Sequence, residues 1–168
     1  MKIKNYNNFQ LSTLNFQLGI PNKTFVHMNI NERQDQIIED FSAFEEWFDK
    51  YSYLIELGNS LDILPEEKKT EENIIRGCQS RVWLDAEQKS DGNVIFKGDS
   101  DAVIVKGILS LLISVMSDQP AADIAGADLY FIERIGLKEH LSPTRSNGLL
   151  AMVKQMKIYG LAYSQKNN

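Results

Sequence analysis

The sequence predicts an α+β domain in which a small antiparallel sheet of about three strands is flanked by helices. Apolar residues recur at helical spacing in the first third of the chain and again towards its end. Between these regions lie short runs rich in β-branched and aromatic residues, separated by a turn sequence. Helices, then a few strands, then helices again is an order typical of α+β domains.

Residues 1–27 differ in composition from the rest of the chain, and we predict that they form a disordered extension before a domain over 28–168. This segment is rich in Asn and Gln, has no Asp or Glu, and shows no clear periodicity. A targeting peptide is the alternative, but the segment lacks the arginines of a transit sequence.

The first expected helix starts at Asn31, where Gln34 would complete a capping box. The spacing of the following apolar residues places them on one helix face: Ile37, Phe41, Phe44, Phe48 and Tyr51. A second short helical stretch over residues 51–58 is expected to end at Gly58, a residue suited to a left-handed helix stop. A polar connector over residues 61–73 follows.

The middle of the chain is expected to form the sheet. Residues 73–75, 82–84 and 94–96 are the expected strands, and Asp91-Gly92 is a turn signal between the last two. A long helix over residues 103–116, capped by Ser100 or Asp101, is apolar nearly all round and should therefore be buried against the sheet.

Two further helices are expected where a proline stands at the first turn. Pro120 opens a short one, and Ser142-Pro143 opens the last. An apolar stripe follows the second proline: Leu149, Met152, Val153, Met156 and Tyr159.

Composition excludes several classes of function. The 168 residues carry a formal net charge of −5 and a pI near 5.1, which argues against binding to nucleic acid. No apolar run is long enough to span a membrane, and no signal-peptide core follows the first residues. We therefore expect a cytoplasmic protein that binds neither nucleic acid nor membrane.

The chain has one cysteine, Cys78, so it forms no internal disulfide. One thiolate is too few to hold an iron–sulfur cluster, and His27 and His140 are the only imidazoles that could join it in a zinc site. We expect no metal on this chain, and any chemical role of Cys78 is that of a single thiol.

The neighbours of Cys78 suit a reactive thiol. Gly77 lets the backbone bend sharply before it, and the positive charges of Arg76 and Arg81 are expected to favour the thiolate. A cysteine on a turn between two strands is also able to protrude into a partner. The alternative is an inert, buried cysteine, which is common in proteins.

Four blocks, in the same order and spacing, resemble the SufE family. The block around Cys78, Gly77-Cys78-Gln79-Ser80-Arg81-Val82-Trp83, is similar to the family's sequence around its sulfur-accepting cysteine. The others are residues 53–58, 98–107 and 141–148, and together the blocks span most of the chain from about residue 30 to 163. The resemblance implies a small antiparallel sheet flanked by helices, a fold shared with NifU-like iron–sulfur scaffold proteins.

The resemblance also implies a function. A cysteine desulfurase of the SufS type, which uses pyridoxal phosphate, would carry sulfur as a persulfide and pass it to Cys78. The SufE-like partner would stimulate the desulfurase and deliver sulfur to an iron–sulfur scaffold, with no cofactor of its own. Six further residues are then candidates for partner binding or loop support: Arg76, Gly77, Gln79, Arg81, Asp99 and Arg145.

Some of these roles have structural alternatives. Asp99 and Asp101 stand at a helix start, where carboxylates cap free N–H groups, and capping is favoured over chemistry for both. Arg145 lies near the first turn of the last helix, where it would bind the partner, hold the cysteine loop or have no role. Trp83 and Gln79 are expected to support the loop.

Alternative functions remain open at this point. The protein could serve a different desulfurase with other sulfur products, or activate a desulfurase by binding alone. It could also be a stand-alone thiol enzyme, a hydrolase or peroxidase, in which His140 acts as the base for Cys78. The sequence alone does not decide whether the protein is an enzyme in its own right.

Overall fold

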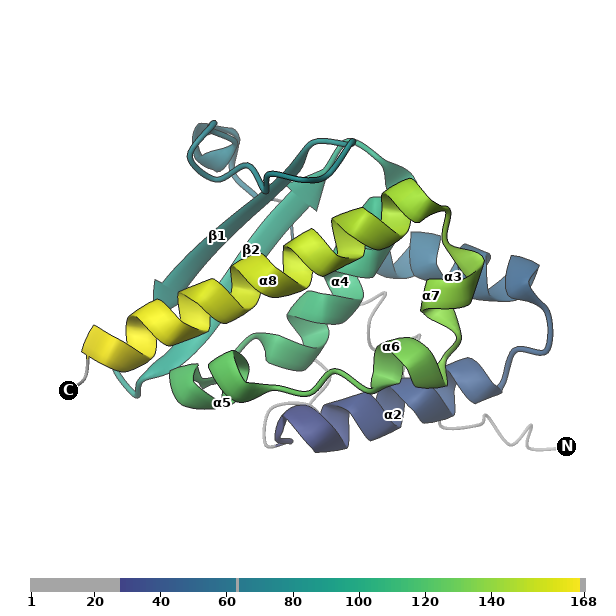
Figure 1. The fold of residues 1–168 in the computed structure, drawn as a ribbon, viewed down its shortest axis with the longest axis horizontal. Helices are drawn as coiled ribbons and strands as arrows, with labels where there is room; N and C mark the ends of the chain where they lie inside the picture. Colours follow the sequence, from purple (N-terminus) through teal and green to yellow (C-terminus); the bar gives the residue numbers. More distant parts are fainter. Residues whose placement is uncertain (1–27, 63, 167–168) are drawn as a thin grey trace, which may run out of the picture.

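Helices pack around a three-stranded antiparallel sheet in the computed structural model, which describes residues 28–62 and 64–166 (Figure 1). The predicted fold class is thereby confirmed. The predicted extension, residues 1–27, lies outside the described residues.

The first described helix, α2 (Ile30–Ser42), begins after Asn29 and not after Asn31 as predicted. The Asn29 side chain accepts a hydrogen bond from the Glu32 backbone N–H at 3.0 Å, and the Glu32 carboxylate accepts one from the Asn29 N–H at 2.8 Å. This capping box leaves Asn31 inside the first turn. Gln34, expected to complete the box, is buried and hydrogen-bonds the backbone of a later segment instead.

A separate helix, α3 (Trp47–Asn59), follows because the chain leaves helical geometry at residues 43–46. The predicted single face is therefore wrong beyond Phe41, and Phe48 is 80% exposed. The spacing of four and three residues continues across the break, and periodicity alone does not show where a helix ends.

Gly58 lies inside α3 and does not end it in a left-handed conformation as predicted. A Cβ atom on Gly58 would lie 2.8 Å from the backbone nitrogen of Gly107, in helix α4 (Val103–Met116). The glycine therefore serves packing, since it lets the backbones of α3 and α4 come into contact.

The first two strands of the sheet form a hairpin close to the predicted positions. Strands β1 (Val82–Gln88) and β2 (Asn93–Ser100) pair antiparallel, with Val82 opposite Ser100. Between them Gly92 has φ +91°, the left-handed backbone that a tight turn requires.

The third strand is not the predicted one. It is β3 (Gln119–Pro120), which pairs with the start of β2. The predicted strand at residues 73–75 is reduced to a single antiparallel bridge between Ile74 and Trp83, because the chain leaves the sheet at residue 76 to form a loop.

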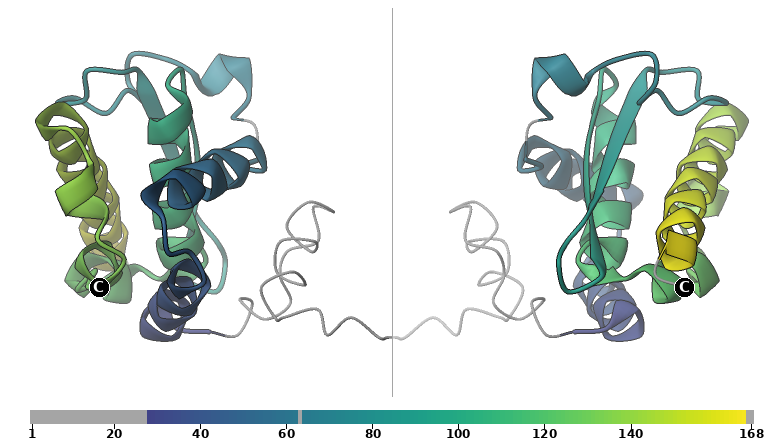
Figure 2. Two further views of the ribbon diagram at one scale, coloured as in Figure 1. Left: turned by 90° about the vertical axis from the view of Figure 1, so that its right-hand side faces the viewer. Right: turned by 90° about the vertical axis from the view of Figure 1, so that its left-hand side faces the viewer.

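Helix α4 lies at the centre of the fold, between α3 and the last helix, α8 (Pro143–Lys166) (Figure 2). It packs along β2 and is largely buried, as predicted. The predicted caps, Ser100 and Asp101, are wrong, because the N-cap is Ala102 and no side chain caps the helix.

The remaining elements are short: η2 (Glu66–Lys68), α5 (Ala121–Gly126), α6 (Phe131–Arg134) and α7 (Leu137–His140). Pro143 is the first residue of α8, as expected, whereas Pro120 is the N-cap residue before α5 and does not lie in its first turn. In the described part of the chain, no helix has both the length and the apolar character needed to cross a membrane.

Candidate functional site

Cys78 lies at the tip of a loop formed by residues 76–81. Backbone hydrogen bonds close the base of this loop: the Ile75 N–H donates to the Val82 carbonyl at 2.8 Å, and the Leu84 N–H donates to the Asn73 carbonyl at 2.8 Å. The loop therefore extends from the end of the sheet, as expected for a cysteine between two paired segments.

The loop, which we call the cysteine loop, is also held where it joins β1. The Arg81 N–H donates to the Asp101 carboxylate at 3.0 Å, and the Ser100 hydroxyl donates to the Arg81 carbonyl at 2.9 Å. Asp101, expected to cap a helix, thus holds the cysteine loop through the backbone of Arg81.

Gly77 has the bend predicted for it. Its φ is +95°, a conformation that residues with a Cβ atom rarely adopt. A Cβ atom on Gly77 would lie 3.5 Å from the Cβ of Ala151, so this part of the loop lies against α8.

The thiol of Cys78 also faces α8. It is half-buried, and its Sγ donates a hydrogen bond to the carbonyl oxygen of Gly148 at 3.6 Å. A Cβ atom on Gly148 would lie 3.5 Å from this Sγ, at van der Waals distance, so the thiol lies directly against α8 at this residue.

The protonation state of Cys78 differs from the prediction. Burial raises the pKa of the Cys78 thiol above its ordinary value, which favours the neutral form. Arg76 and Arg81 are both exposed to solvent, and screening by water weakens their effect on the thiol. This direction is opposite to the one predicted from Arg76 and Arg81.

A hollow of about 440 Å³ lies beside Cys78. The cysteine loop contributes Cys78, Gln79 and Ser80, and the start of α4 contributes residues 102–105. The start of α8 adds Arg145, so a cation lines the same hollow as the thiol. The structure thus brings Arg145 to the same hollow as Cys78 and Gln79, two neighbouring predicted site residues that lie far from Arg145 in the sequence.

Asp99 lies away from this hollow and does not cap a helix as expected. Its carboxylate forms ion pairs with Lys69 of the connector at 2.9 Å and with Lys106 of α4 at 3.0 Å. Burial alone would raise the pKa of Asp99, but hydrogen bonds from both lysines and from the Ser100 N–H outweigh burial and hold the pKa below its ordinary value. Asp99 therefore joins three segments around the base of the cysteine loop.

Trp83 stands opposite Asp99 in the β1–β2 pairing. It is half-buried, and the Lys69 ammonium lies 5.9 Å from the centre of its ring. Trp83 thus packs at the base of the cysteine loop, consistent with the supporting role expected for it.

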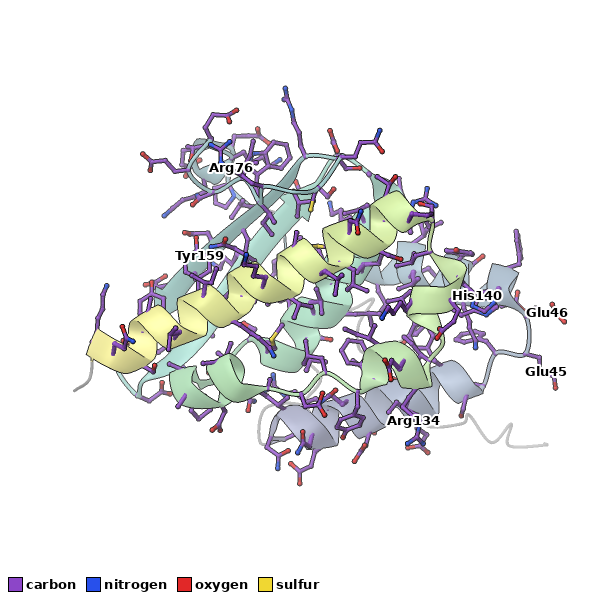
Figure 3. All side chains as sticks on the ribbon, in the orientation of Figure 1. Glu45, Glu46, Arg76, Arg134, His140 and Tyr159 are labelled. Atoms are coloured by element: carbon purple, nitrogen blue, oxygen red, sulfur yellow. The ribbon has the colours of Figure 1, made fainter. Side chains whose placement is uncertain are left out.

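His140 is not placed to act as a base for Cys78. Its ring stacks on Trp47 with 3.8 Å between ring centres, and its Nδ1 lies 3.0 Å from the Gly136 carbonyl oxygen. Figure 3 shows His140 far from Arg76, which belongs to the cysteine loop. His140 is also absent from the residues that line the hollow.

Three residues of the site were not anticipated as such: Gly148, Lys69 and Lys106. Gly148 and Lys106 lie in two of the blocks that resemble the SufE family, and the blocks could have pointed to both residues. Their contacts, however, depend on how α8 and α4 pack. Lys69 lies in a run of charged residues that is typical of a solvated connector. Within residues 28–62 and 64–166, no group of three or more His, Cys, Asp or Glu side chains is placed to hold a metal.

Fold and site together define a small α+β protein that presents one half-sheltered thiol at the tip of a loop. Comparison with known families agrees with this description. The sequence model of the SufE family, described as an Fe-S metabolism associated domain, matches residues 35–159.

Two SufE-like proteins from rhizobia are similar over most of the chain. That of Rhizobium etli is 46% identical over 127 residues, 73% of this chain and 86% of the relative. That of Rhizobium meliloti is 42% identical over 127 residues, 73% of this chain and 91% of the relative. The chain belongs to the SufE family, whose domain is associated with iron–sulfur metabolism.

The fold is also found in a solved structure. The solution structure of a hypothetical protein from Thermus thermophilus matches with a TM-score of 0.66 at 19% identity. The match covers 79% of this chain and 96% of that protein. At this identity the likeness shows a common fold.

Proposed function

We propose that the protein is a sulfur carrier in which Cys78 accepts sulfur from the persulfide of a cysteine desulfurase. It would stimulate the desulfurase and pass the sulfur to iron–sulfur cluster assembly. The main support is the placement of the only cysteine of the chain at a loop tip, beside a hollow that also contains Arg145. The family's association with iron–sulfur metabolism supports the destination of the sulfur.

The proposed transfer is a thiol exchange. The Cys78 thiolate attacks the outer sulfur of the donor persulfide, a new S–S bond forms on Cys78, and the donor's S–S bond breaks. The donor leaves as a thiolate, and the outer sulfur keeps its proton, so neither an oxidant nor a reductant is consumed. Cys78 holds the resulting persulfide until a recipient thiol attacks it in the same way.

In this proposal, loss of the proton from Cys78 is the step that depends on the docked donor. Burial raises the pKa of the resting thiol, and only the thiolate is a good nucleophile. Arg145 lines the same hollow, and its guanidinium offers several N–H donors and a fixed positive charge. Docking of the donor would bring Arg145 and the ionised sulfur together and so stabilise the thiolate when the donor is present.

The cofactor and partners follow from this chemistry. Sulfur exchange on Cys78 needs no cofactor on this chain, whereas removal of sulfur from free cysteine requires the pyridoxal phosphate of the desulfurase. A desulfurase of the SufS type is the proposed donor, and an iron–sulfur scaffold is the proposed recipient.

Intact-mass spectrometry tests the proposal. The full chain is incubated with cysteine and a SufS-type desulfurase, beside a Cys78→Ala variant. We expect a gain of about one sulfur atom, about 32 Da, that a thiol reductant removes and that the variant lacks. Turnover of the desulfurase should rise with the wild-type protein and stay at its basal level with the variant.

The other functions predict different results. Stimulation by Cys78→Ala equal to that of the wild type would show activation by binding alone. No added sulfur and no stimulation, with several desulfurases, would contradict the proposal. A stand-alone thiol enzyme would act on a small substrate without any desulfurase, and the distance between His140 and the cysteine loop counts against it.

A further inference from the structure

Helix α8 carries a second apolar side that the core does not cover. In the described part of the chain, five large apolar side chains are exposed, and three of them lie on α8: Leu150, Ile158 and Leu161. Their exposed fractions are 58%, 46% and 52%. An exposed apolar stripe of this kind, continued along one helix, often marks a binding surface.

This stripe points away from the cysteine loop. Leu150 follows Gly148 by two residues, which is about 200° round a helix. Because Gly148 contacts Cys78, Leu150 and Leu161 lie on the opposite side of α8 from the thiol. A molecule bound along the stripe would therefore leave the hollow beside Cys78 accessible.

The stripe forms one wall of a shallow groove of about 400 Å³, which we call the α8 groove. Leu150, Val153, Ile158 and Leu161 line it from α8, and Ala125 lines it from α5. From Leu150 to Leu161 the groove follows about three helical turns, or roughly 16 Å. The lining residues have the spacing along which a second helix packs, and Lys154 and Lys157 stand between the two leucines on this line.

The charge of the α8 groove indicates what it binds. Its two charged lining residues are lysines, Lys154 and Lys157, although the protein as a whole carries a net charge of −5. We propose that the α8 groove binds an amphipathic helix of a partner protein whose apolar stripe is bordered by Asp or Glu residues. Such a helix would bury the exposed leucines and pair its carboxylates with both lysines.

A second copy of this chain fits less well. Antiparallel packing of two α8 helices about a two-fold axis would place Leu150 opposite Leu161, but it would also place Lys154 opposite Lys157 of the other copy. Like charges brought together at an interface are unfavourable. An anionic membrane surface also fits less well, because two lysines on a protein of net charge −5 provide little attraction.

Two synthetic helical peptides of equal length test this inference. Both carry leucines at the spacing of the groove over four turns; one has Glu at the flanking positions and the other has Lys. Fluorescence anisotropy measures their binding to the full chain. We expect the Glu peptide to bind at least about tenfold more tightly than the Lys peptide, a difference of about 1.4 kcal/mol.

Variants of the residues that line the groove give the decisive comparison. The double change Lys154→Glu and Lys157→Glu should reverse the preference between the peptides, and Leu150→Ser with Leu161→Ser should abolish binding of both. Equal binding of both peptides, no binding, or binding unchanged in these variants would overturn the proposal.

Two other results would assign the groove to a different occupant and also overturn the proposal. One is self-association in sedimentation velocity that is lost in the double Ser variant. The other is binding to phosphatidylserine vesicles that is lost in the double Glu variant while the Glu peptide does not bind. None of these measurements involves sulfur, so failure here is distinct from failure of the proposed carrier function.

Discussion

Cys78 and Gly148 form the contact that determines the surroundings of the thiol. The sulfur lies at hydrogen-bond distance from the Gly148 carbonyl oxygen, and a Cβ atom on Gly148 would lie 3.5 Å from it. A loop residue is thereby sheltered by a helix that lies seventy residues later in the chain.

Replacement of Gly148 should slow the proposed sulfur transfer without lowering the stability of the fold. In Gly148→Ala the new Cβ lies 3.5 Å from the sulfur, an ordinary contact, and alanine favours a helix over glycine by about 0.8–1.0 kcal/mol. We expect chemical denaturation to show an unchanged or slightly increased stability, and the rate of persulfide formation on Cys78 to fall.

Gly160 provides the matched control on the same helix. In Gly160→Ala the Cβ would lie 2.8 Å from the Ala125 nitrogen, so overpacking should destabilise the protein by about 1–3 kcal/mol. Equal destabilisation by both changes would contradict the packing described at Gly148.

The reactivity of Cys78 follows from its burial. Since burial raises the pKa of the thiol, less thiolate is present at pH 7 than in an unfolded cysteine peptide. We expect iodoacetamide to modify Cys78 more slowly than the peptide at pH 7, and the midpoint of the rate–pH curve to lie above the ordinary cysteine value of about 8.5. A midpoint below that value would show that the arginines of the loop do control the thiol.

At the scale of elements, the cysteine loop depends on the backbone as well as on side chains. Its base is closed by hydrogen bonds of Ile75 and Leu84, and its end is held by Asp101 through Arg81. The sharp bend before the thiol requires the positive φ of Gly77.

Two glycine turns allow a direct test of this dependence. Gly77 and Gly92 have similar φ values, +95° and +91°, so each change to Ala should cost about 1–2 kcal/mol of stability. Gly77→Ala should also reduce sulfur acceptance strongly, whereas Gly92→Ala in the β1–β2 turn should leave it near the wild-type value. Measurement of denaturation midpoints and of persulfide mass gain on both variants distinguishes the two effects.

The sequence predicts the elements whose signals are local. The β1–β2 hairpin follows from alternation around the Asp91-Gly92 turn, and the burial of α4 follows from its apolar residues. The break at residues 43–46 was missed because the apolar spacing continues through it. The two-residue strand β3 was missed because so short a strand has no pattern of its own.

In the site, too, the sequence predicts only the features that have a local signal. Cys78 and Gly77 are recognisable because one is the only cysteine and the other precedes it. The place of Arg145 beside the thiol, and the pairing of Lys69 and Lys106 with Asp99, depend on tertiary packing between distant segments. Local charge around Cys78 also gave the wrong direction for its pKa, because burial outweighs the exposed arginines.

At the scale of the whole molecule, Asp99 links the connector, the sheet and the central helix. Lys69 precedes the cysteine loop, Asp99 lies near the end of β2, and Lys106 lies in the first turns of α4. The carboxylate is nearly buried, so its charge is compensated mainly by these two lysines.

Asp99→Asn should therefore lower stability at neutral pH by about 1–3 kcal/mol, since Lys106 loses its ion pair and Lys69 keeps only its pair with Glu66. The pKa of Asp99 is depressed in the folded state, so its contribution is fully present above the unfolded value of about 3.9 and is lost as the pH falls through the lower folded value. Urea denaturation of wild type and variant should show a constant difference from pH 7 to about 5 that shrinks below about pH 4. A difference that does not depend on pH would contradict the ionic role.

The close contact between Cys78 and α8 has a consequence for the proposed transfer of sulfur. A persulfide lengthens the side chain by about 2 Å. The Sγ of Cys78 already lies 3.6 Å from the Gly148 carbonyl oxygen, so another sulfur does not fit between them. The added atom must point into the hollow beside Arg145, or the cysteine loop must shift. The persulfide form and the free-thiol form would then differ in the conformation of the cysteine loop. A donor would recognise the free-thiol form and a recipient the persulfide form, and this difference would set the direction of sulfur transfer.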